Sequence, residues 1–251
     1  ADLKLSYTDA FFEAMSGLTT TGSTVMLGLD FTPPGILLWR ALLQWLGGIG
    51  IIAMAIAILP LLQVGGMQLF RMESSDTSDK VMPRTTQIVT YISVLYLALT
   101  ALCALLYWFG GMSGFDAITH AMTTIATGGF SNHDASIGFF KSPVIDATAT
   151  VFMVIGGMPF VLYLQAIRGA PARLIRDSQV RWFLVIVFMS IIIMWFYRAG
   201  VVEDSALARL RSVAFNVVSV ITGTGYATED YSAWGPFAVS AMFFLMFVGG
   251  C

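Results

Sequence analysis

The 251 residues of this chain are too apolar for an ordinary soluble domain: 57% are hydrophobic, only 11% are charged, and the mean hydropathy is +0.80. Soluble domains carry about 25% charged residues, so this composition indicates a membrane protein. The net charge of −2 excludes a basic nucleic-acid binder, and two cysteines provide no disulfide framework. The chain begins without Met and stops inside an apolar run, so we expect an internal fragment of a longer protein.

Apolar runs that are long enough, or nearly long enough, to cross a bilayer recur along the chain; a crossing takes about 20 helical residues. In chain order they are residues 36–62, 86–109, 144–167, the shorter 182–197, and the truncated run 236–251. Three segments of helical character, each about half a bilayer long, alternate with them at 9–22, 115–129 and 209–225. Each half-span ends in a cluster of Thr and Gly. Extended backbone at membrane depth must be buried in protein or line a water-filled cavity, so these segments indicate a pore or a binding site.

The three half-spans are copies of one motif. EAMSGLTTTGST (13–24), HAMTTIATGGFS (120–131) and NVVSVITGTGYA (216–227) align without gaps. They share a glycine at Gly22, Gly129 and Gly225, and each has a hydroxyl residue six positions earlier. A polar residue stands nine positions before each glycine, at Glu13, His120 and Asn216. Registered copies of one motif indicate a repeat architecture.

The repeating unit is therefore a span, a pore helix, a Thr/Gly filter segment and a second span. This predicts an all-α integral membrane protein with a first repeat at residues 1–65, a second at 86–167 and a truncated third at 182–251. Loops 66–85 and 168–181 join the repeats. Because three repeats do not close a four-fold pore, we expect a fourth unit beyond Cys251 and a pseudo-four-fold pore in the complete chain.

Both connecting loops are predicted to be cytoplasmic because they are basic. They contain seven of the 13 Lys and Arg residues: Arg71, Lys80, Arg84, Arg168, Arg173, Arg176 and Arg181. The opposite side is acidic, with Asp30, Asp134, Glu203, Asp204, Glu229 and Asp230. This acidic face either attracts cations or only serves solubility and topology.

The filter segments have the composition that coordination of a dehydrated cation requires. Backbone carbonyls replace the water around the ion, glycine permits positive φ, and threonine adds a hydroxyl oxygen. The oxygens that we expect to bind the cation belong to Thr20, Thr21, Gly22, Ser23, Thr127, Gly128, Gly129, Phe130, Gly223, Thr224, Gly225 and Tyr226. Glu13, His120 and Asn216 either brace the filter from behind or only satisfy local polar groups.

Several motifs resemble one family, the bacterial potassium-uptake subunits of the TrkH, TrkG and KtrB type, which are related to plant HKT transporters. They are DAFFEAMSGLTTTGST, RALLQWLGGIGI, GGMQLFRMES, HAMTTIATGGFSNHDASIGFF and ITGTGYATEDYSAWGPF, and the resemblance covers essentially the whole chain. It implies a multi-pass protein of the bacterial inner membrane, with filter glycines at Gly22, Gly129 and Gly225. Potassium would be the transported ligand, with no other cofactor. The resemblance also implies contact with membrane lipid, a homodimer, and a cytosolic nucleotide-binding regulator of the TrkA type.

The resemblance also implies an intramembrane gating loop whose first residues are 249–251. Channel-like flux and symport with protons or sodium both remain open. The alternative is a sodium- or proton-coupled secondary transporter of another fold, which would have discontinuous spans and inverted repeats. An enzyme is not expected, because HExxH, Walker A, GxSxG and paired-Cys motifs are absent from the sequence.

Other residues carry local expectations. We expect Arg40 to snorkel at the outer start of a span, and Asp146 to face the outer water as a cap. Gly47, Gly48 and Gly50 are expected to let a pore helix approach closely. Loop 66–85 is either a docking surface for a cytosolic partner or an ordinary solvated connection.

Overall fold

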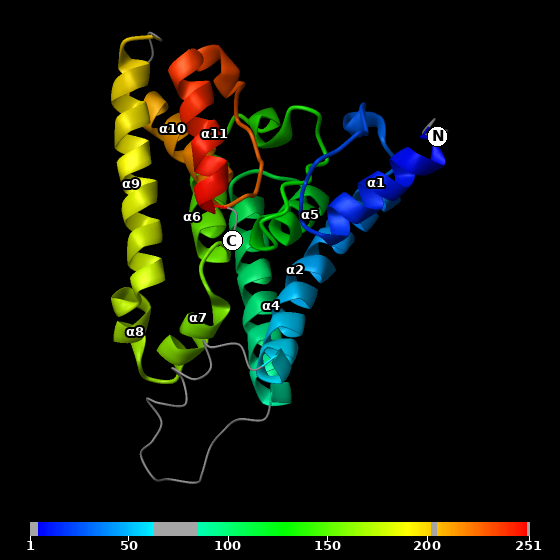
Figure 1. Ribbon diagram of the computed structural model, residues 1–251. Coiled ribbons are helices and arrows are strands. Elements are labelled where there is room, and N and C mark those ends of the chain that lie inside the picture. Colours follow the sequence, from blue (N-terminus) through cyan, green and yellow to red (C-terminus); the bar gives the residue numbers. More distant parts are fainter. Residues whose placement is uncertain (1–4, 63–84, 202–204, 250–251) are drawn as a thin grey trace.

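The computed structural model describes residues 5–62, 85–201 and 205–249, and their side chains except in 51–62 and 85–87. This part of the chain contains helices and no strand, in agreement with the predicted all-α class (Figure 1). The α-helices are α1 (Tyr7–Leu18), α2 (Pro34–Leu62), α4 (Thr85–Phe109), α5 (Gly114–Ile125), α6 (Pro143–Gly156), α7 (Phe160–Ile167), α8 (Pro171–Arg176), α9 (Ser178–Ala199), α10 (Ala206–Ile221) and α11 (Pro236–Gly249). Three 3-10 helices lie in the connections: η1 (Leu29–Phe31), η2 (Ser136–Phe139) and η3 (Tyr231–Trp234).

The predicted half-spans are the short helices α1, α5 and α10, which lie in the upper half of Figure 1 beside the long helices. Helix α5 packs against α4 and α6 of its own unit and against α2 of the first unit. Helix α10 repeats this relation, because it packs against α9 and α11 of its own unit and against α6 of the second. Helices α5 and α10 are thus each held between their own unit and the preceding one, as a cyclic array requires.

All three pore helices begin at a serine cap. The hydroxyls of Ser6, Ser113 and Ser205 each accept a hydrogen bond from the backbone N–H three residues later, which satisfies an otherwise unpaired amide of the first turn. Because of these caps, α1 begins two residues before the predicted half-span and α10 begins three residues before it.

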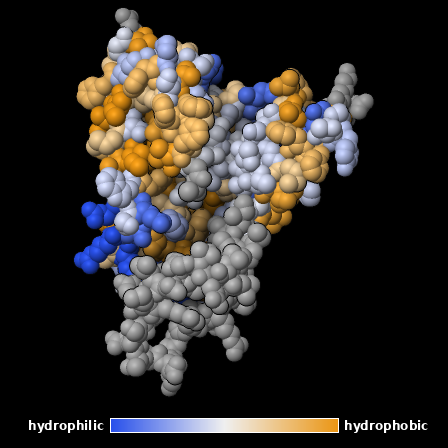
Figure 2. All heavy atoms as spheres, viewed as in Figure 1, coloured by the Kyte–Doolittle hydropathy of each residue, from blue (hydrophilic) through white to orange (hydrophobic). Residues whose placement is uncertain are grey.

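Two of the described helices, Ile88–Phe109 and Ser178–Ala199, are long and apolar enough to cross a membrane. Their outward faces carry exposed large side chains such as Leu97 and Phe188. Exposed apolar surface of this extent belongs in lipid rather than in water, and Figure 2 shows hydrophobic residues over much of the surface in view. The hydrophilic cluster at the lower left of the coloured surface lies at the level of α8, a helix that contains Arg173 and Arg176.

The predicted span 144–167 is broken rather than straight. Helices α6 and α7 meet at an angle of 90°, and the break follows Gly156 and Gly157 and includes Pro159, which has no N–H to continue the helical ladder. The connection 168–181 contains α8 and the first turn of α9, because Asp177 caps α9 by accepting hydrogen bonds from the N–H groups of Gln179 and Val180. Loop 66–85 lies outside the described residues apart from Thr85, as do Glu203 and Asp204.

A second repeat, which the sequence analysis did not identify, packs the second spans onto the pore helices. The pattern Pro-x12-Gly-Gly begins at Pro34, Pro143 and Pro236. A Cβ on its first glycine would overlap the carbonyl oxygen of Leu18 in the first unit and that of Ile221 in the third, and would lie 3.0 Å from that of Ile125 in the second. In each unit, therefore, the second span contacts the last residue of its own pore helix.

The second glycine of the pattern contacts the following unit instead. A Cβ on Gly48 would lie 3.2 Å from Cα of Ala126, and one on Gly157 would lie 3.1 Å from Cγ2 of Thr222. Ala126 and Thr222 occupy the same position of the motif, directly after their pore helices. The close approach predicted at Gly47 and Gly48 is confirmed. It is wrong for Gly50, where a Cβ would have no neighbour among the described residues within 4 Å.

Candidate ion pathway

The three filter segments share one backbone conformation. The glycines at the common position have φ of 79° at Gly22, 76° at Gly129 and 81° at Gly225. Two residues earlier, φ is again positive, at 55° for Thr20, 48° for Thr127 and 71° for Gly223. A β-branched residue with positive φ is a genuine outlier, so Thr20 and Thr127 show that the tertiary structure enforces this path.

The filter amides point back toward the pore helices. The N–H groups of Thr21 and Gly128 donate to the carbonyls of Ser16 and Thr123, both at 2.9 Å, and that of Gly225 donates to Ser219 at 3.2 Å. The three acceptors are the hydroxyl residues of the repeat. Because these amides are directed backward, carbonyls of the extended segments are left for the other side.

The three segments also converge on one another. A Cβ on Gly22 would overlap the carbonyl oxygen of Gly128 and lie 3.5 Å from that of Thr224. A Cβ on Gly129 would overlap the carbonyl oxygen of Thr224 in turn. Each glycine therefore faces the carbonyl that precedes the next glycine of the series. At Gly225 a Cβ would meet no atom of the described residues within 4 Å, so no described filter segment faces the third glycine.

The residues that follow the glycines are held in different ways. The Ser16 hydroxyl donates to the Ser23 carbonyl at 2.6 Å, and the Ser219 hydroxyl donates to the Tyr226 carbonyl at 2.7 Å. In the second unit, Thr123 instead hydrogen-bonds the phenol hydroxyl of Tyr226 and so joins the second and third units. The rings of Phe130 and Tyr226 are buried, so only their backbone oxygens are available to an ion.

Glu13, His120 and Asn216 each reach a hydroxyl beyond the filter glycine. Thr24 donates to Glu13 at 2.8 Å, Nε2 of His120 lies 2.9 Å from the Ser131 hydroxyl, and Nδ2 of Asn216 donates to Thr228 at 2.9 Å. All three polar residues are buried. Each therefore ties a pore helix to the chain that leaves its filter segment.

Arg40 does not snorkel to the surface: it is only 3% exposed. Its Nε donates to Glu13 at 2.8 Å, its Nη1 donates to the Ser131 carbonyl at 3.0 Å, and the guanidinium lies 4.1 Å from the Phe130 ring centre. The expectation was wrong because hydropathy does not indicate that Glu13, an acid at membrane depth, requires a buried partner.

Gln44 lies one helical turn after Arg40 and was also missed by the sequence analysis. Its Nε2 donates to the Gly128 carbonyl at 2.6 Å, and its Oε1 accepts from the Phe130 N–H at 3.0 Å. The side chain is fully buried. Its only sequence signal was a polar residue within an apolar span, which is expensive in a membrane and therefore a functional candidate.

Further ion pairs lie outside the filter segments. Arg198 pairs with Glu229 at 2.5 Å and lies over the Trp234 ring. Asp146 is buried and pairs with Arg211 at 3.2 Å, so the expectation that it faces water was wrong. Between the first two units, Nδ1 of His133 lies 2.5 Å from Asp30, and Asp134 accepts from the Leu29 N–H.

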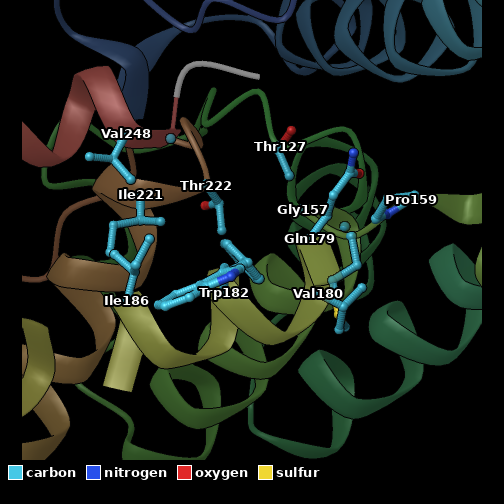
Figure 3. Close-up of a pocket in the computed structure, with 14 residues that line it drawn as sticks. Thr127, Gly157, Pro159, Gln179, Val180, Trp182, Ile186, Ile221, Thr222 and Val248 are labelled. Atoms are coloured by element: carbon cyan, nitrogen blue, oxygen red, sulfur yellow. The ribbon is translucent and has the colours of Figure 1, made fainter. Parts of the chain in front are cut away.

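A cavity of about 460 Å³ lies where the second and third filter segments begin. Figure 3 shows Thr127 and Thr222 beside it, with Trp182 and Ile186 of α9 below them in the view. Gly249, the last described residue of α11, also lines this cavity. Of the predicted gating-loop residues, positions 250 and 251 lie outside the described residues. The cavity is thus lined by the start of two filter segments, the start of α9 and the end of α11.

Known proteins match this arrangement along the whole chain. A family model described as a TrkH cation transport protein matches residues 1–251. The potassium uptake protein TrkI of Halomonas elongata is 50% identical over 99% of this chain and 50% of its own length. TrkH of Escherichia coli K12 is 43% identical over 98% of this chain and 52% of its own length.

A solved structure of this family has the same fold. The crystal structure of the potassium transporter TrkH from Vibrio parahaemolyticus superposes with a TM-score of 0.88 at 37% identity, and the match covers 100% of this chain and 51% of that one. The chain therefore spans about half the length of the relatives it matches. This likeness excludes the alternative of a transporter of another fold, although the bend between α6 and α7 is the kind of discontinuity which that alternative predicted.

Proposed function

The chain belongs to the TrkH cation transport family, and from this premise we propose that the complete protein carries potassium ions across the bacterial inner membrane as a multi-pass Trk-system subunit. Potassium is then the transported ligand, and no resident cofactor is required. The observation that carries the proposal is the repeated backbone path of the filter segments, with positive φ at Gly22, Gly129 and Gly225 and again two residues before each of them.

The chemistry of this path suits a dehydrated monovalent cation. The pore helices end at the filter segments, so the negative ends of their dipoles lie beside the ion. Carbonyls directed away from the pore helices replace the water of the ion. The carbonyls that precede Gly129 and Gly225 have the clearest geometry, because neighbouring segments face them. The ring of oxygens is completed by a fourth segment in the full-length protein.

Of the remaining roles, bracing of the filter rests on hydrogen bonds, and the partners rest on the family. We assign Glu13, His120 and Asn216 to bracing of the filter, on the basis of their hydrogen bonds to hydroxyls beyond it. The exposed apolar faces of α4 and α9 are in contact with membrane lipid. The full protein forms homodimers and binds a cytosolic nucleotide-binding regulator of the TrkA type.

Rubidium uptake into liposomes that contain the full-length protein tests this function, with potassium, sodium and lithium as competitors. We expect potassium to compete better than sodium, and Gly129→Ser to reduce this preference, because a Cβ at that position overlaps the Thr224 carbonyl. Gly50→Ser is the matched control, since a Cβ there meets no described atom within 4 Å.

Gly156→Ser is a poorer control, because its Cβ would lie 3.0 Å from the Ile125 carbonyl. Equal competition by sodium in the wild type would contradict the potassium assignment. An unchanged preference in Gly129→Ser would contradict the placement of the filter.

A further inference from the structure

Helix α2 of the first unit runs along the filter segment of the second unit. Arg40, Gln44 and Gly48, each one helical turn apart, share one face of α2. They contact Ser131, then Gly128 and Phe130, then Ala126. One face of α2 thus follows this filter from its outer end to its inner end.

Gln44 is the member of this face that holds the filter glycine in place. The amide donates to the carbonyl before Gly129 and accepts from the N–H after it, so both bonds flank the residue with positive φ. Because a carbonyl only accepts and an N–H only donates, these partners fix the orientation of the amide. Rotation of the peptides on either side of Gly129 would break one bond or the other.

The other filters are supported differently at this position. In the first and third units a threonine precedes the glycine, and its hydroxyl pairs with a second threonine: Thr19 with Thr21, and Thr222 with Thr224, both at 2.8 Å. The second unit has Gly128 there. A Cβ on Gly128 would overlap the Gln44 amide, and φ of Gly128 is not positive. A side chain at residue 128 would therefore displace the Gln44 amide from its two partners, whereas the backbone φ at this position does not call for glycine.

The Pro-x12-Gly-Gly repeat shows which residue of another unit corresponds to Gln44. Counted from their prolines, Gln44 of the first unit corresponds to Met153 of the second. Gln44 lies in the second span before the second filter, which has glycine at residue 128. Met153 lies in the second span before the third filter, which has threonine at residue 224. The polar group that supports the filter comes from the preceding span in one case and from the filter itself in the other.

We propose that Gln44 is a positioning residue that determines ion selectivity through the second filter segment, so that the second span of one unit sets the filter geometry of the next. The inference rests on the proposed potassium transport. Gln44 does not bind the ion; it holds the Gly128 carbonyl and the Phe130 amide in the orientation that the ion requires.

The test measures potassium-over-sodium competition against rubidium uptake by full-length protein in liposomes. Gln44→Met keeps nearly the same side-chain volume and removes both hydrogen bonds. We expect the preference to fall about five-fold for each buried hydrogen bond that is lost. Thr100→Val is the matched control. It removes the hydroxyl that accepts from Trp45 at 3.1 Å and donates to the Tyr96 carbonyl at 2.8 Å. Neither partner belongs to a filter segment, and we expect the preference to be unchanged.

A double variant tests the exchange itself. Gly128→Thr alone should abolish selective uptake, because its Cβ collides with Gln44. Gln44→Met with Gly128→Thr copies the methionine and the threonine of Met153 and Thr224, and it removes the collision. Because Ala126 stands where the third filter has Thr222, the new threonine lacks the hydroxyl partner of Thr224, and we expect part of the preference to be restored. If Gln44→Met gives no folded protein, Gln44→Leu replaces it, since it also removes both hydrogen bonds and buries no charge.

The outcomes separate the two proposals. A selective wild type whose preference is unchanged in Gln44→Met or its replacement overturns the role of Gln44 alone. A double variant no better than Gly128→Thr overturns the exchange between the units. A wild type without any preference for potassium overturns the proposed function, and this inference falls with it.

Discussion

The first and third units carry different residues at the polar position of the pore helix, nine residues before the filter glycine. In the first unit it is Glu13, paired with Arg40 at 2.8 Å with both side chains less than 10% exposed. In the third unit it is Asn216, which makes neutral hydrogen bonds to Ser212 and Thr228. Arginine is present there too, but Arg198 comes from the first span and pairs with Glu229, whose side chain is 36% exposed.

The difference shows that the repeat conserves contacts rather than charges. Both polar side chains reach a hydroxyl beyond the filter glycine, at Thr24 or at Thr228. Only the first unit adds an arginine that also reaches the next unit, through the Ser131 carbonyl. The charged version therefore joins two units, whereas the neutral version acts within one. Three substitutions sharpen this comparison.

The largest effect is expected from Arg40→Leu. It leaves Glu13 buried without its cation, and breaking a buried pair costs about 3–5 kcal/mol. We expect little folded full-length protein and a much lower thermal midpoint in detergent. Adding Glu13→Gln should recover part of the loss, because an amide oxygen at the position of Oε2 still accepts from Thr24 and from the Val25 N–H. A double variant less stable than Arg40→Leu would show that the charge is not the cause.

A smaller effect is expected from Asn216→Ala in the third unit. It removes two hydrogen bonds of 2.9 Å and leaves the Thr228 hydroxyl without this donor, which costs about 1–3 kcal/mol. Oδ1 of Asn216 has no hydrogen-bond donor among the described residues, so Asn216→Asp should be worse than alanine. The thermal midpoints of both variants measure the order, and an aspartate variant as stable as wild type would refute it.

The smallest effect is expected from Asp30→Asn, in the loop that meets the second unit. The hydrogen bond with His133 lowers the pKa of Asp30 below its ordinary value of 3.8. This carboxylate therefore stabilises the folded state above that pH, and the contribution is lost as the pH falls through the lower folded value. An exposed pair contributes at most about 1 kcal/mol.

Thermal midpoints of wild type and Asp30→Asn, compared from neutral pH down to about pH 3, should therefore differ slightly and then converge. A gap between the two proteins that widens as the pH falls would contradict this account. His133→Gln, which removes the ionisable partner and retains a hydrogen-bond donor, is the control for the loss of charge at residue 133.

Much of the architecture was predictable because the same motif occurs three times, so that each copy supports the interpretation of the others. Three registered copies around Gly22, Gly129 and Gly225 identified the half-spans and the extended segments after them. The apolar runs identified the long helices to within a few residues. The Pro-x12-Gly-Gly pattern was equally visible in the sequence but was not identified. Its first glycine marks a contact with the pore helix of the same unit, and its second glycine, in the first two units, marks a contact with the next unit.

The sequence by itself determined the helical class, the repeating unit and the positions of the filter glycines, because each depends on local composition and on spacing along the chain. Only the tertiary structure decided which side chains support which filter. Arg40 and Gln44 lie in an apolar run of the first unit, yet they bind backbone atoms 84 to 91 residues away in the second. The reason is physical: a buried polar group must find a partner, but its own sequence does not indicate which distant carbonyl or amide that partner will be.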